Sequence, residues 1–142
     1  MFSISWDTLH AGMTHFPIAL LLFSTVCDFL SVTFRKLAFA PDLRLVSFYS
    51  LAAAAVASLG ALVSGIALTN GPLWGSGALL WHHAFVWPAF GLLVALSIWR
   101  LIAKNMMAGA ALYLYLLLMT LASGIIAAAG YFGGELLLNG GS

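Results

Sequence analysis

Four long apolar segments, separated by short polar stretches, account for nearly the whole sequence. They cover about 14–34, 43–68, 78–102 and 106–129. A helix needs about 20 apolar residues to cross a hydrocarbon layer ~30 Å thick, so each segment is long enough for one crossing. The pattern predicts an all-α fold, a four-transmembrane-helix bundle that forms a single domain over residues 1–142.

The polar breaks between these segments carry helix-stop and turn signals. Arg35 and Lys36 end the first segment, and Arg100 and Lys104 end the third. The second segment stops at the sequence Thr69-Asn70-Gly71-Pro72, which is typical of a turn. The breaks therefore support four separate helices connected by short loops.

Prolines and glycines modify the expected helices. We expect Pro17 in the first turn of the first helix, where a missing N–H costs little, and we expect Pro88 to kink the third helix. The last apolar run continues past Gly130 and the pair Gly133-Gly134 to Leu138. This run is too long for one crossing, so the fourth helix is expected to tilt or to break at the glycines.

Composition agrees with a membrane protein. Hydrophobic residues make up 63% of the 142 residues and charged residues only 6%, whereas soluble domains carry about 25% charged residues. The lipid bilayer is therefore the expected surrounding, and no basic patch suggests binding of nucleic acid. The single cysteine, Cys27, lies in an apolar run and is expected to be a buried free thiol.

The positions of the basic residues predict an orientation. All five lie in the two loops on one side of the bundle: Arg35, Lys36, Arg44, Arg100 and Lys104. Basic loops face the cytoplasm, so both termini are expected on the outer, periplasmic side of a bacterial inner membrane. Residues 1–10 contain no Lys or Arg, so the first segment is expected to be a retained helix and not a signal peptide.

All four histidines are expected near the outer face. His10 and His15 open the first segment, and His82 and His83 open the third, which runs in the same direction. Neutral imidazole binds haem iron, copper and zinc, and helix bundles build such sites from facing helices. The histidines therefore predict a cofactor site between these two helices.

The four histidines have three possible interpretations. His15 and His83 are the deeper members of their pairs and are the expected axial ligands of haem b, with His10 and His82 in support or merely solvated. A copper or zinc site would instead gather three or four of the histidines, although His10 and His15, five residues apart, lie on different helix faces. The imidazoles could also serve only packing and hydrogen bonding.

Two acidic residues are further candidates. Glu135 is expected at the level of the histidines, where it could accept a hydrogen bond from a ligating imidazole or lie at the interface without a role in binding. Asp28 is expected near the cytoplasmic end of the first helix. Arg35, two turns away, is its expected ion-pair partner, and a role in a proton pathway is the alternative.

Three stretches of the sequence carry a resemblance to a known family. They are His15-Phe16-Pro17-Ile18-Ala19-Leu20-Leu21-Leu22 with Asp28 after it, His83-Ala84, and Gly130-Tyr131-Phe132-Gly133-Gly134-Glu135-Leu136. Together they resemble the bacterial membrane family known as domain of unknown function 2231, over nearly the whole chain.

The resemblance implies a four-span membrane domain in a redox setting, because relatives look fused to Rieske-type iron–sulfur or cytochrome c modules. It implies His15 and His83 as motif histidines and Asp28 and Glu135 as motif acids. The family often has His-Pro where this chain has His10-Ala11, which weakens a role for His10.

These patterns lead to one expected function and two alternatives. We expect an electron-transfer subunit that binds haem b and works with other membrane or periplasmic redox subunits, more than a stand-alone enzyme. The first alternative is a cofactor-free structural or accessory subunit of a larger membrane complex. The second is a protein that handles copper or zinc.

Overall fold

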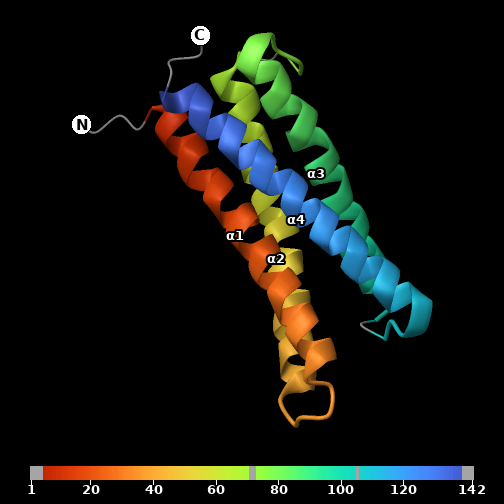
Figure 1. The fold of residues 1–142 in the computed structure, drawn as a ribbon. Coiled ribbons are helices and arrows are strands. Elements are labelled where there is room, and N and C mark those ends of the chain that lie inside the picture. Colours follow the sequence, from red (N-terminus) through yellow and green to blue (C-terminus); the bar gives the residue numbers. More distant parts are fainter. Residues whose placement is uncertain (1–4, 71–72, 105, 139–142) are drawn as a thin grey trace.

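The computed structural model describes residues 5–70, 73–104 and 106–138, and this part of the chain forms four helices (Figure 1). They are α1 (Trp6–Thr33), α2 (Ala40–Leu68), α3 (Gly77–Ile102) and α4 (Gly109–Leu138). Each is long and apolar enough to cross a membrane. The predicted all-α fold with four membrane-spanning helices is confirmed.

The helices form an up-and-down bundle in which neighbours in sequence are neighbours in space. α1 packs against α2 and α4, and α3 packs against α4 and α2. Figure 1 shows the start of α1 and the end of α4 at the same end of the bundle, and the hairpins α1–α2 and α3–α4 diverge toward the other end. We call the first the histidine end, because α1 and α3 begin there and carry their histidines near these starts. We call the second the basic end, because the exposed basic residues lie near it.

Two helices extend beyond the predicted segments. α1 begins at Trp6, so Pro17 lies well inside this helix and is buried, and its predicted place in the first turn is wrong. α4 continues through Gly133 and Gly134 to Leu138 without a break. A continuous helix satisfies its own backbone hydrogen bonds, which in lipid outweighs the low helix propensity of glycine.

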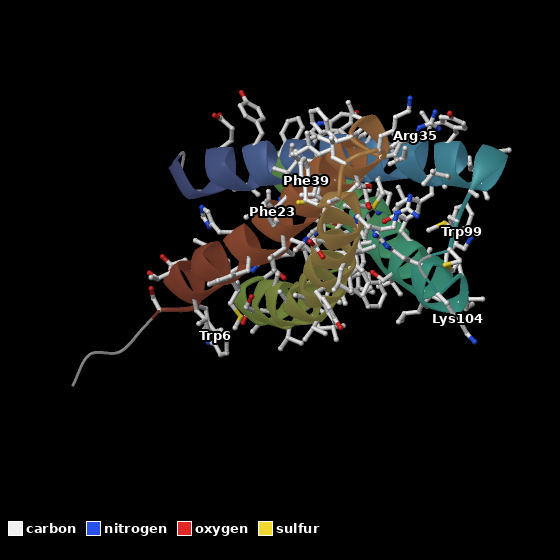
Figure 2. All side chains as sticks on the ribbon, turned by 90° about the horizontal axis from the view of Figure 1, so that it is seen from below. Trp6, Phe23, Arg35, Phe39, Trp99 and Lys104 are labelled. Carbon is white, nitrogen blue, oxygen red and sulfur yellow. The ribbon has the colours of Figure 1, made fainter. Side chains whose placement is uncertain are left out.

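Apolar side chains fill the interior of the bundle and also cover its outside, unlike in a soluble protein. The interior contains Leu21, Leu93 and Met119, all fully buried. Large apolar side chains also cover the outside, such as Phe23 and Phe39, labelled in Figure 2 and about half exposed. This is expected for helices surrounded by lipid, where burying an apolar side chain brings little advantage. Cys27 is a buried free thiol, as predicted.

Candidate functional site

The buried face of α1 connects a histidine to an acid. Buried residues on α1 run from Pro17 through Ser24 to Asp28, at spacings of the kind that place side chains on one helix face. Going back along the same face from Pro17 leads to His10 and not to His15. His10 is accordingly half-buried, whereas His15 is exposed.

α3 repeats this arrangement with a base in place of the acid. Its buried face runs from Ala89 through Leu96 to Arg100, and going back along it leads to His82. The histidine precedes the charged residue by 18 positions in both helices, which is five full turns at about 3.6 residues per turn. Each of these helices therefore presents an imidazole at one end and a charged group at the other, on the same inward face.

A cavity of about 450 Å³ occupies the histidine end of the bundle. All four histidines line it, together with residues of α2 and α4, so it lies among all four helices. Its volume falls within the range of about 300–1,000 Å³ typical of small-molecule and cofactor pockets. Most other lining residues are apolar, among them Leu62, Phe90 and Ile126.

His10 is oriented by a hydrogen bond to α2. Its Nδ1 lies 2.9 Å from Ser64 Oγ, and the Ser64 hydroxyl donates its only proton to the carbonyl of Ala61 at 3.0 Å. His10 Nδ1 must therefore carry the donated proton, which leaves Nε2 with a lone pair when the ring is neutral. A Cβ on Gly65 would lie 2.9 Å from His10 Cε1, so this ring packs directly against the α2 backbone.

His82 is oriented in the same way against α4. Its Nδ1 lies 2.9 Å from the carbonyl oxygen of Ala129, which can only accept, so Nδ1 is again the protonated nitrogen. A Cβ on Gly133 would lie 3.0 Å from His82 Cε1. Histidines that ligate metals commonly donate their second ring N–H to a carbonyl or carboxylate, and this contact fixes their orientation.

His15 and His83, the two histidines predicted as haem ligands, are not held by hydrogen bonds to neighbouring helices within the described residues. His15 Nδ1 donates to the carbonyl of Ala11 on its own helix, and the side chain is exposed. His83 is half-buried, and its Nδ1 is a buried atom without a hydrogen-bond partner in the described part of the chain. Buried polar atoms nearly always have a partner, so this nitrogen is suited to an added ligand or water.

Ring contacts connect three of the histidines. The ring centroids of His10 and His82 are 6.5 Å apart with nearly perpendicular planes, and those of His82 and His83 are 5.7 Å apart. Within the described ranges, no group of three or more His, Cys, Asp or Glu side chains could hold one metal ion. The gathering of three or four histidines expected for copper or zinc is therefore not formed.

Glu135 is near the end of α4 but does not line the cavity, although its neighbours Gly134 and Leu136 do. Its expected hydrogen bond to a ligating imidazole stays a prediction.

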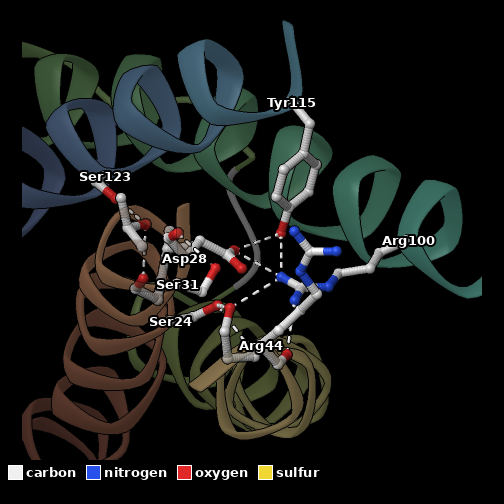
Figure 3. A network of polar contacts seen from close by, with 10 residues as sticks. Ser24, Asp28, Ser31, Arg44, Arg100, Tyr115 and Ser123 are labelled. Carbon is white, nitrogen blue, oxygen red and sulfur yellow. Dashed lines mark hydrogen bonds and ion pairs between the residues drawn. The ribbon is translucent and has the colours of Figure 1, made fainter. Parts of the chain in front are cut away.

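A buried polar network joins all four helices toward the basic end (Figure 3). Arg100 of α3 donates from Nη1 to Asp28 of α1 at 2.6 Å, to Ser47 of α2 at 2.9 Å and to the Tyr115 hydroxyl of α4 at 2.6 Å. Its Nη2 donates to the backbone carbonyl of Arg44 at 2.9 Å, and Tyr115 donates to Asp28 at 3.1 Å. Arg100 is 1% exposed, so these contacts, and not water, stabilise its positive charge.

The network corrects two predictions. The partner of Asp28 is Arg100 and not Arg35, which is exposed. Arg100 itself lies inside α3 and not in a connecting loop. Proximity in sequence suggested Arg35. The five-turn spacing from His82 places Arg100 on the inward face of α3 and made it a candidate, but its partner is decided by how the helices pack.

Comparison with known proteins adds a family. A family profile described as Predicted membrane protein (DUF2231) matches residues 6–141, and thus extends over all four helices. No curated protein and no solved structure matches the chain.

Proposed function

We propose that this chain, which belongs to the DUF2231 family of predicted membrane proteins, is an electron-transfer subunit that binds haem b in the histidine-lined cavity. One histidine of α1 and one of α3 would hold the haem iron. The observation that carries the proposal is the cavity of about 450 Å³ lined by all four histidines.

The number of imidazoles favours haem over a small ion. A copper or zinc ion held by protein alone takes three or four ligands, whereas haem iron needs only one or two because the macrocycle supplies the rest. The described residues form no group of three ligands, but His10 and His82 form a pair of neighbouring rings from two helices. The apolar side chains of the cavity would cover the macrocycle and exclude water from it.

The spacing of the rings favours one pair of ligands. Two histidines that hold one iron must bring their rings close together from separate helices. The His10 ring of α1 and the His82 ring of α3 do so, with centroids 6.5 Å apart. His10 and His82 are thus favoured over the pair His15 and His83, which stays the prediction from sequence.

The surrounding residues would tune this pair. Ser64 and the Ala129 carbonyl hold the Nδ1 atoms, so both Nε2 lone pairs remain available to a ligand. Haem iron, when bound, supplies reversible one-electron transfer. Hydrogen bonds to Nδ1 increase the basicity of an imidazole ligand and fix its plane.

The proposal includes a location. Four exposed or half-exposed basic residues lie toward the basic end, Arg35, Lys36, Arg44 and Lys104, so this end would face the cytoplasm of a bacterial inner membrane. The histidine end would then face the periplasm and meet membrane or periplasmic redox subunits there.

Labelling with a membrane-impermeant thiol reagent tests this orientation. Ser76→Cys at the histidine end should react from outside intact cells and Lys36→Cys at the basic end should not. The buried Cys27 gives little background. The reverse pattern of labelling would exclude the proposed orientation.

The haem proposal is tested by absorption spectra of the purified protein in detergent, oxidised and reduced with dithionite, with metal analysis of the same sample. We expect a sharp reduced α-band that is lost in His10→Ala and in His82→Ala and kept in His15→Ala and His83→Ala. Loss in the second pair only would assign the axial ligands to His15 and His83.

Two other outcomes would reject haem. Stoichiometric copper or zinc without a visible band would favour the small-ion alternative. A colourless, metal-free protein expressed with haem available would favour a structural or accessory subunit.

A further inference from the structure

A second cavity lies at the basic end, remote from the histidines. It has a volume of about 350 Å³ and is lined by residues from both hairpins: Ser31, Arg35, Ala40, Pro41 and Arg44 on the α1–α2 side, and Lys104 and Met106 after α3. Figure 1 shows the hairpins diverging here, and Figure 2 shows Arg35 and Lys104 on opposite sides of this end. The cavity is a crevice between the two hairpins.

The lining of this crevice carries charge of one sign. Three of the five basic residues of the chain contribute to it, Arg35, Arg44 and Lys104, and no lining residue is acidic. Asp28, the nearest buried acid, is already paired with Arg100. In the part of the chain that the structure describes, no carboxylate pairs with any of the three lining cations.

The crevice is joined to the core network through one residue. The backbone carbonyl of Arg44 accepts a hydrogen bond from Arg100, and Figure 3 shows the Arg44 side chain beside that network. Arg44 is half-exposed, and within the described residues no carboxylate pairs with its guanidinium. An anion in the crevice would supply the missing opposite charge.

We propose that the crevice binds the phosphate headgroup of an anionic phospholipid. The chemistry recognised is a phosphate, for which arginine is well suited because its planar guanidinium can donate two parallel hydrogen bonds. A lipid is the favoured source because the crevice lies at the ends of membrane-spanning helices, where headgroups are expected and where basic pockets between helices bind acidic headgroups. Ala40, Pro41 and Met106 offer apolar contacts beside the charges. The proposal does not depend on haem or on the orientation of the chain.

Lys36 provides a matched control. It is basic, exposed and adjacent in sequence to Arg35, but it does not line the crevice. Replacing either residue by glutamine removes one positive charge from the same end of the molecule. General attraction to an acidic bilayer would respond equally to both changes, whereas a specific site responds only to Arg35.

Native mass spectrometry of the full chain in detergent, with equal phosphatidylglycerol and phosphatidylcholine added, tests the proposal. We expect wild-type protein and Lys36→Gln to retain phosphatidylglycerol in preference to phosphatidylcholine. Arg35→Gln, Arg44→Gln and Lys104→Gln should each retain about fivefold less, since a basic residue near the membrane surface contributes about 1 kcal/mol. Arg44→Lys, which keeps the charge, should lose less than Arg44→Gln.

Three results would overturn the proposal: equal retention of the two lipids, equal losses in Lys36→Gln and the crevice variants, or full competition by millimolar inorganic phosphate, which would indicate a site for free phosphate. If Arg44→Gln does not fold, the exposed residues Arg35 and Lys104 carry the test alone.

Discussion

The two ends of the bundle use the same helix faces for different purposes. Toward the basic end, the buried charges of Asp28 and Arg100 neutralise each other, Arg100 donates to Ser47 and Asp28 accepts from Tyr115. At the histidine end, His10 and His82 are each held through one nitrogen beside a cavity of about 450 Å³. Polar groups among membrane helices either use all their hydrogen-bonding atoms within the structure or keep one such atom without a partner helix. Groups of the second kind, such as His10 and His82, are the candidates for ligand binding.

Removing one member of the ion pair should have the largest effect. Arg100→Met leaves the Asp28 carboxylate buried without its cation, which is expected to cost about 3–5 kcal/mol of the free energy of unfolding. Thermal or denaturant unfolding in detergent measures the loss. The double variant Asp28→Leu/Arg100→Met should recover much of it, because no unpaired charge remains. An equal loss in Arg35→Gln would contradict the assignment of Arg100 as the partner of Asp28.

Removing one hydroxyl from the network should have a smaller effect. Tyr115→Phe deletes the acceptor of an Arg100 hydrogen bond and a donor to Asp28, and we expect a loss of about 1.5–3 kcal/mol because both partners are charged. The control is Tyr113→Phe on the same helix, whose side chain is 68% exposed. Similar unfolding midpoints for the two variants would argue that the network contributes little to stability.

Displacing the His82 ring should affect haem binding in the cavity more than it affects the stability of the fold. Gly133→Ala places a Cβ 3.0 Å from His82 Cε1, so the ring must shift and strain its bond to Ala129. We expect stability about 1 kcal/mol below that of the matched Gly124→Ala variant, together with weaker haem retention, measured by unfolding and by the reduced spectrum. Gly124→Ala on the same helix meets nothing within 4 Å and should be neutral or stabilising. Equal haem retention in both variants would separate His82 from the ligand site.

An interhelical hydroxyl pair between the two ends should have the smallest effect. Thr25 donates to the Leu21 carbonyl, so the Ser123 hydroxyl of α4 donates to Thr25 at 2.9 Å. Ser123→Ala is expected to cost about 0.6 kcal/mol, the average for such bonds between membrane helices. A loss as large as that of Tyr115→Phe would show that stability is not concentrated at the basic end.

Part of the site was predictable from the sequence and part was not. The level of the histidines followed from counting four helices, because α1 and α3 run in the same direction. The selection of His15 and His83 as ligands, which stays a prediction, used depth along the helix and did not consider the rotation of each residue about the helix axis. The 18-residue spacing from His10 to Asp28 and from His82 to Arg100 contains that rotation and was visible in the sequence.

The sequence by itself determined the number of helices, their apolar character and the separation of histidines from basic residues, because hydropathy and charge act on each segment locally. Only the tertiary structure decided that Arg100 and not Arg35 neutralises Asp28. It also decided that the four histidines line one cavity, where α2 holds Nδ1 of His10 and α4 holds Nδ1 of His82. Those contacts join residues of different helices, and helix packing in lipid depends on the shapes of facing surfaces, which no single segment specifies.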